Sequence, residues 1–146
     1  MKQVKKVVAY VCETPVTGTE MVISKESQLE KIYKYAQREN IEVVAVYEDE
    51  KWSENFTTRP GVQKVMDCKE KVDAVLVDRV WCFSRKMSEL KPFVEELEKN
   101  NEQLVSATCL WDCVSQQIRQ RYMGSLAEKQ RQAAKAKTAA NVSVAA

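Results

Sequence analysis

The stretch "VDAVLVDRVWCFSRKMSEL", from Val72 to Leu90, decides the fold. It begins with a short run rich in β-branched residues and without polar alternation, which is typical of a strand covered on both faces. A loop with two arginines, Trp81 and Cys82 follows, and "SELKPFVEELEKNN" then places apolar residues at helical spacing. A buried strand, a loop and a helix in this order predict one unit of a parallel sheet.

The same alternation runs along most of the chain. Further strands are predicted in "KKVVAYVC", "IEVVAVYED" and "EQLVSA", and further helices in "SKESQLEKIYKYAQREN" and "RPGVQKVMDCKEK". Ser24 or Ser27 can cap the first helix, Ser88 can cap the third, and two asparagines end the third. We therefore predict an α/β fold, a mostly parallel sheet of four or five strands with helices on both faces, flavodoxin-like in shape.

The ligand crevice of such a sheet lies beyond the carboxyl ends of its strands. Three loops follow predicted strands there: "ETPVTGTE" at residues 13–20, "EKWSENFTTRP" at residues 50–60 and "DRVWCFSRK" at residues 78–86. We expect these loops to form the functional site together.

Composition narrows the class of protein. The chain has 146 residues and 45% hydrophobic content, enough for one domain with its own core. It holds no run of roughly 18 apolar residues and no cleavage-site pattern, so we expect no membrane contact and a cytoplasmic location. Five cysteines without a C-x-x-C pair, and no histidine, favour reduced thiols over disulfides or a zinc site. No metal and no cofactor is predicted.

Positive charge is concentrated in the C-terminal segment. Residues 115–146 hold six basic residues and one acidic residue, a net charge of +5, whereas the whole chain carries +2. The candidate DNA-binding residues are Arg119, Arg121, Lys129, Arg131, Lys135 and Lys137. They favour contact with a polyanion, and a solvated helix face without a partner is an equally weighted alternative.

Residues 115–138 are predicted to form one long helix. Ile118, Tyr122 and Leu126 make an apolar stripe along it, four residues apart. Gly124 costs the helix about 1 kcal/mol relative to alanine, so the helix needs a packing partner and we expect a homodimer through it. The chain then divides into an α/β domain at residues 1–114, this helix, and a tail at residues 139–146 that has little to bury.

Several segments, in their order, resemble the catalytic domain of serine site-specific recombinases, the resolvase and invertase family. They are "AYVCET", "SQLEKIYKYA", "YEDEKWSENFTTRPGVQKVM", "VDAVLVDRVWCFSRKMSEL" and "MGSLAEKQRQAAKAKT", and they span Val7 to about Thr138. The more specific pieces are "TRPG" after an acidic, serine-containing loop and "FSRKMSEL" after a strand. The resemblance implies an enzyme in which a serine hydroxyl attacks a DNA phosphate while arginines hold the phosphate oxygens.

The resemblance assigns site residues position by position. The candidate catalytic residues are Thr14, Arg59, Arg85 and Gln28, at family positions of a serine, two arginines and a glutamine. Two further family arginines are replaced, by Cys12 on the first strand and by Cys82 in the third loop. Trp81 stands beside Cys82, where the family presents a polar residue. The resemblance therefore implies an active site with part of its chemistry removed.

These residues also have ordinary structural explanations. Thr14 can shape a turn, and Arg59 can bind backbone carbonyls. Arg85 can pair with Glu89 four residues later, and Trp81 is expected to fill space, as is the nearby Phe83.

Three functions remain open. The favoured one is a catalytically impaired recombinase-like protein that acts on DNA as a regulator or assembly partner. The second is an active recombinase that forms a covalent phosphothreonine intermediate with DNA through Thr14. A small-molecule binder ranks last, because the chain has only three glycines and no glycine-rich phosphate loop.

Overall fold

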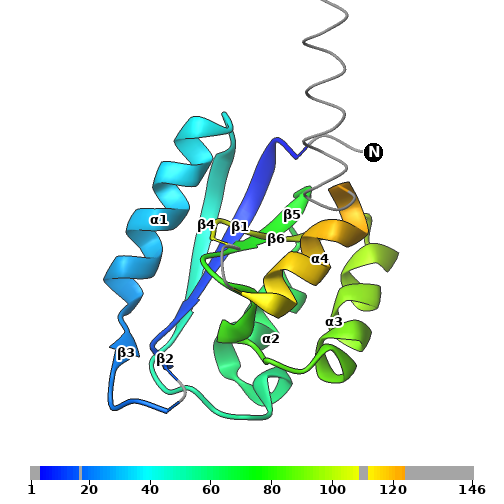
Figure 1. Cartoon of the computed structure of the whole chain (residues 1–146). Coiled ribbons are helices and arrows are strands. Elements are labelled where there is room, and N and C mark those ends of the chain that lie inside the picture. The colour runs from blue at the N-terminus through cyan, green and yellow to red at the C-terminus, as the bar shows by residue number, and fades with distance from the viewer. Residues whose placement is uncertain (1–3, 17, 109–111, 124–146) are drawn as a thin grey trace, which may run out of the picture.

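The computed structural model describes residues 4–16, 18–108 and 112–123. Figure 1 shows a sheet with helices on both faces. Its strands are β1 (Lys6–Cys12), β4 (Glu42–Asp49), β5 (Ala74–Val77) and β6 (Gln103–Ser106), in the spatial order β4-β1-β5-β6. Every neighbouring pair in this sheet is parallel. The predicted α/β fold with a four-stranded parallel sheet is confirmed.

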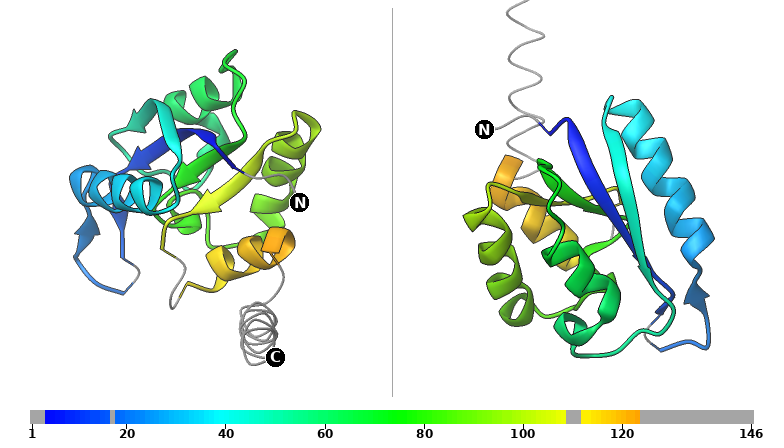
Figure 2. Two further views of the ribbon diagram at one scale, coloured as in Figure 1. Left: turned by 90° about the horizontal axis from the view of Figure 1, so that it is seen from above. Right: turned by 180° about the vertical axis from the view of Figure 1, so that it is seen from behind.

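Helices cover the two faces unequally. The helices are α1 (Lys25–Arg38), α2 (Pro60–Met66), α3 (Met87–Lys99) and α4 (Cys113–Met123), with 3-10 turns η1 (Phe56–Thr58) and η2 (Val80–Cys82). The two views in Figure 2 show α1 on one side of the sheet and α2 and α3 on the other. The helix α4 packs against β6 and η2.

Two cores follow from the alternation of β1. Val7, Ala9 and Val11 pack with Ile32 and Ala36 of α1. The intervening residues Val8, Tyr10 and Cys12 face the larger core under α2 and α3. None of these six β1 residues is more than 1% exposed, which confirms a strand covered on both faces.

Helix capping agrees with the sequence at one helix and differs at another. Ser24 caps α1, because its side chain accepts the N–H of the residue three positions later at 3.1 Å. The cap predicted at Ser88 is wrong, since α3 already begins at Met87 and its N-cap residue makes no side-chain cap bond. The Ser84 hydroxyl instead accepts the N–H of Lys86 at 3.0 Å, and this bond turns the chain into the helix.

The first predicted loop contains an antiparallel hairpin. Its strands are β2 (Thr14–Pro15) and β3 (Val22–Ile23), and Thr14 pairs with Ile23. Two-residue strands carry no alternation that a sequence pattern can detect, so the hairpin went unpredicted. It fixes the backbone of Thr14 two residues after the end of β1.

The helix α4 covers the described part of the predicted long C-terminal helix. Residues 124–138 and the predicted tail at 139–146 lie outside the described residues. α4 begins at Cys113, ahead of the predicted domain boundary, and it buries Val114 and Ile118 in the larger core. Its first turns are thus part of the α/β core. Within the described ranges, no helix has the length and apolar character that crossing a membrane requires.

Candidate functional site

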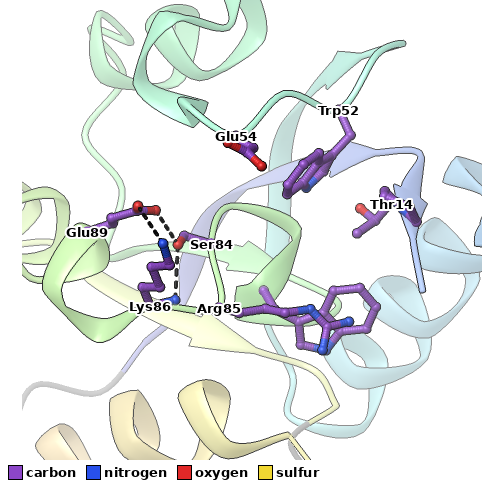
Figure 3. A pocket seen from close by; sticks show the side chains of 9 residues that line it. Thr14, Trp52, Glu54, Ser84, Arg85, Lys86 and Glu89 are labelled. Atoms are coloured by element: carbon purple, nitrogen blue, oxygen red, sulfur yellow. Dashed lines mark hydrogen bonds and ion pairs between the residues drawn. The ribbon is translucent and has the colours of Figure 1, made fainter. Parts of the chain in front are cut away.

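A cavity of about 190 Å³ opens at the carboxyl ends of β1, β4 and β5 (Figure 3). All three loops expected to form the site contribute to its wall. The lining residues are Thr14, Pro15, Trp52, Glu54, Trp81, Ser84, Arg85, Lys86 and Glu89. Two of the four candidate catalytic residues, Thr14 and Arg85, therefore line one cavity, whereas Arg59 and Gln28 do not.

Thr14 is held by its own chain. It is 2% exposed, and its hydroxyl donates to the Cys12 carbonyl at 2.6 Å. The proton that a base would remove from a nucleophile is engaged in this bond, and only a small part of the side chain reaches the cavity. This contact is the one that a turn-shaping threonine makes.

Gln28 ties α1 to the end of β1. Its side-chain amide donates to the carbonyl of Cys12 at 2.6 Å and to that of Ile23 at 3.0 Å, and its oxygen accepts the Cys12 N–H at 3.3 Å. The Cys12 carbonyl thus receives hydrogen bonds from both Gln28 and Thr14. These bonds anchor the hairpin and satisfy a buried strand end.

The two cysteines that the sequence resemblance aligns with arginines are buried. Cys12 is fully buried and Cys82 is 3% exposed. Burial raises the pKa of both thiols, against the opposing effect of the nearby Arg59. Both groups are therefore neutral at physiological pH and supply no charge to a phosphate.

Arg59 lies in the core behind the cavity. It is 3% exposed, and its guanidinium donates to the carbonyls of Cys82 at 2.8 Å and Ser53 at 2.5 Å. It also lies 3.4 Å from the Tyr10 hydroxyl, which donates to Asp49 at 2.8 Å. Arg59 therefore ties the second and third loops together, in agreement with the carbonyl-binding explanation.

Arg85 lies over the face of Trp81. The guanidinium carbon is 4.2 Å from the indole centroid, within the range of a cation–π contact. The alternative pairing of Arg85 with Glu89 is not formed, because the Glu89 carboxylate accepts from Ser84 at 2.6 Å and lies 4.0 Å from Lys86. Arg85 is the one candidate arginine that faces the cavity.

The aromatic residues divide between core and cavity. Phe83 is fully buried and stacks on Tyr10 with ring centroids 5.0 Å apart. Trp81 is 7% exposed, which confirms its packing role, but its ring also borders the cavity. Trp52 was missed as a site residue. It packs over Arg59 at 5.3 Å and forms the opposite wall, and its only signal in the sequence is its place in the second site loop.

The apolar stripe on α4 packs within the chain itself. Ile118 is 1% exposed, and Tyr122 packs against the same core. Arg121 forms a two-bond ion pair with Glu98 of α3, with N–O distances of 2.6 and 2.9 Å. Arg119 is half-buried on the same helix. Leu126, Lys129, Arg131, Lys135 and Lys137 lie outside the described residues.

Asp78, which directly follows β5, is expected to make the free energy of unfolding depend on pH. Burial raises the pKa of its carboxyl group, which accepts from Thr108 at 2.8 Å through one oxygen; the other oxygen has no hydrogen-bond partner in the described part of the chain. A carboxyl with a raised folded-state pKa binds more protons in the native state, so stability falls as pH rises from about 3.9 through that pKa. Asp78→Asn should be more stable than wild type at neutral pH.

The measurement is urea unfolding across the acid to neutral range. The advantage of Asp78→Asn should disappear at acid pH, where Asp78 is protonated in both states. Glu20→Gln, at an exposed position, serves as the control. A variant that is less stable than wild type at neutral pH would contradict the prediction.

Comparisons with known proteins agree on the fold. The family model described as "Resolvase, N terminal domain" matches residues 17–146. Three solved structures align over most of both chains. The N-terminal catalytic domain of TP901-1 integrase has 21% identity and a TM-score of 0.62, with 88% of this chain and 98% of that one covered.

The other two are of similar strength. The C-terminal catalytic domain of ISC1926 TnpA, an IS607-like serine recombinase, has 20% identity and a TM-score of 0.57 over 92% of this chain and 99% of that one. A resolvase family site-specific recombinase from Streptococcus pneumoniae has 19% identity and a TM-score of 0.56, with coverages of 94% and 95%. The comparison with curated protein sequences found no match. The family match covers far more than half of the sequence and the fold agrees with it, so the chain belongs to the resolvase family of serine recombinase domains.

Proposed function

We propose that this resolvase-family chain takes part in DNA transactions with strand-exchange catalysis impaired, as a regulator or assembly partner. The observation that carries the proposal is the state of the phosphate-handling positions. The Thr14 hydroxyl is bonded to a backbone carbonyl, and neutral buried thiols stand at positions 12 and 82. Arg59 is engaged with carbonyl groups, which leaves Arg85 as the one candidate arginine at the cavity.

Phosphoryl transfer makes the loss of positive charge costly. A phosphorus centre gains negative charge in the transition state and needs cations that are already in place. Removing one such group lowers a rate by about 10²- to 10³-fold, and two losses lower it further without being additive. The secondary hydroxyl of Thr14 is also bulkier than that of a serine.

The second candidate is an active recombinase with Thr14 as nucleophile. The observation that favours it is that Thr14 and Arg85 line the same cavity. In this alternative the Thr14 hydroxyl leaves its bond to Cys12 and gives its proton to solvent, and its oxygen bonds to phosphorus to form a phosphothreonine linkage. The P–O bond to the cleaved DNA strand breaks, and the leaving oxygen takes up a proton from solvent.

An adduct assay separates the two candidates. The full chain is incubated with supercoiled and nicked DNA, quenched in denaturant and examined for protein-linked DNA. We expect no adduct from wild type or from Thr14→Ser, because the serine hydroxyl would meet the same carbonyl and the same neutral thiols. A wild-type adduct that disappears in Thr14→Ala would overturn the proposal in favour of the active recombinase.

DNA association and dimer formation belong to the same proposal. The basic segment from residue 115 onward supports contacts to phosphates, which carry little sequence preference and weaken steeply with salt. Ile118 and Tyr122 are occupied within their own subunit, so a homodimer through the C-terminal helix would use residues beyond them. A cytoplasmic location, where thiols stay reduced, completes the proposal.

A further inference from the structure

Three planar groups, those of Trp52, Trp81 and Arg85, line the cavity. The Arg85 guanidinium covers one face of the Trp81 indole at 4.2 Å. The Trp52 indole stands across the cavity from Arg85 (Figure 3), and the Arg59 guanidinium carbon lies 5.3 Å from the centroid of the Trp52 ring. The cavity thus carries one indole ring and one arginine-covered indole ring in its lining, and we refer to the space beside Trp52 and Arg85 as the Trp52 slot.

We propose that the Trp52 slot binds an unpaired nucleobase that carries its sugar phosphate; this inference rests on the proposed role in DNA transactions. Tryptophan rings and arginine planes are the surfaces on which proteins stack unpaired bases, because every base has a π face. Trp81, where the sequence resemblance places a polar residue, thus adds a flat aromatic surface to the cavity. The Trp81 ring supplies the platform on which the Arg85 guanidinium rests at the cavity.

The size of the cavity selects a single base. Pockets for small-molecule ligands usually enclose about 300–1,000 Å³. At about 190 Å³, this cavity has room for one flat ring system, and the sugar and phosphate must remain at its mouth. Lys86 lines the cavity with a side chain that is 75% exposed, and its ammonium group, 4.0 Å from the Glu89 carboxylate, can also meet a phosphate.

The charges of the cavity agree with a nucleotide and disfavour a cationic ligand. Two tryptophans with two glutamates would suit an ammonium ligand in isolation. Arg85 already occupies the face of Trp81, however, and Lys86 adds a second positive charge to the lining. The exposed carboxylate of Glu54 can instead accept a hydrogen bond from an exocyclic amino group, so cytosine should bind more tightly than thymine.

The test compares two oligodeoxynucleotides of equal length, one of cytidines and one of abasic residues, by fluorescence anisotropy with the full chain. Both carry the same phosphates, so only a bound base distinguishes them. Wild type should bind the cytidine oligomer about tenfold or more tightly than the abasic one. Trp52→Ala should remove this difference, whereas Trp52→Phe should keep most of it.

Arg85→Lys separates stacking from charge, because lysine keeps the charge and loses the plane. It should weaken cytidine binding and leave abasic binding unchanged. Tyr33→Ala is the matched control, since Tyr33 is an aromatic residue 51% exposed on α1, on the other side of the sheet. Thermal unfolding of each variant checks that the fold is retained.

A third arm titrates free deoxycytidine monophosphate. Trp52-dependent binding of the mononucleotide assigns the slot to free nucleotides, and Trp52-dependent binding of the oligomer alone assigns it to single-stranded DNA. The proposal would be wrong if wild type bound the cytidine and abasic oligomers equally tightly. It would also be wrong if Trp52→Ala kept the preference for the cytidine oligomer. Neither result bears on impaired catalysis, which is decided by the covalent adduct.

Discussion

Replacing Arg59 by alanine is expected to lower the free energy of unfolding by about 3–5 kcal/mol. The guanidinium supplies short hydrogen bonds to the buried carbonyl of Cys82 and the partly buried carbonyl of Ser53, and a buried acceptor left without a donor costs about 1–3 kcal/mol. The lost packing against Trp52 adds to this. Since a domain is usually stable by only about 5–15 kcal/mol, the variant would lose a large share of its stability. Urea unfolding followed by circular dichroism measures it.

Two variants calibrate this result. Arg59→Lys keeps the charge but cannot reach both carbonyls with one ammonium group, so it should fall between wild type and Arg59→Ala. Arg38→Ala removes an arginine whose side chain is 70% exposed on α1, and it should change stability by no more than about 0.5 kcal/mol. A loss below about 1 kcal/mol in Arg59→Ala, together with loss of DNA binding, would show that Arg59 is a phosphate ligand and not a structural tie.

Gly61→Ala is expected to destabilise the fold by about 2–4 kcal/mol, although alanine is the better helix former. A Cβ at Gly61 would lie 2.5 Å from the carbonyl oxygen of Glu48 and 2.5 Å from a carboxylate oxygen of Asp49. The backbone N–H of Gly61 donates to Asp49 at 2.8 Å, so α2 approaches β4 through this contact. Overpacking costs about 1–3 kcal/mol, and displacement of the hydrogen bond adds about 1 kcal/mol more.

The direction of the stability change in Gly61→Ala distinguishes crowding against β4 from helix propensity. Helix propensity alone predicts that Gly61→Ala gains up to about 1 kcal/mol. Gln63→Ala introduces alanine at an exposed position on the same helix without crowding, so it serves as the control and should be nearly neutral. A stable Gly61→Ala variant in chemical unfolding would mean that α2 does not pack this closely on β4.

The fold was predictable because its strands carry strong signals. The segments around Val8 and Val75 contain almost nothing polar, and strands buried on both faces within alternating helices have few alternatives. The β2–β3 hairpin could not be predicted, since a two-residue strand gives no period to read. The start of α3 was misplaced because the Ser84 side chain holds the turn before the helix, and a serine at either position looks equally suitable in the sequence.

The site was predictable in its loops but not in the roles of its side chains. Arg59 and Arg85 look alike in sequence, and only tertiary packing turns the first toward backbone carbonyls and the second toward a cavity. The sequence did not identify Trp52 as a site residue, because a single aromatic residue in a polar loop has no periodic pattern that shows which way its side chain points. Its place opposite Arg85 depends on how the second and third loops meet.

The burial of Cys12 also bears on evolutionary reversibility. An arginine at this position would have to enter a filled core beside Tyr10 and Cys82, so it would cost stability before it could help any reaction. A serine in place of Thr14 would meet the same occupied carbonyl. Under the proposed function, neither single replacement would restore strand exchange, and several mutations acquired together would be needed to restore it.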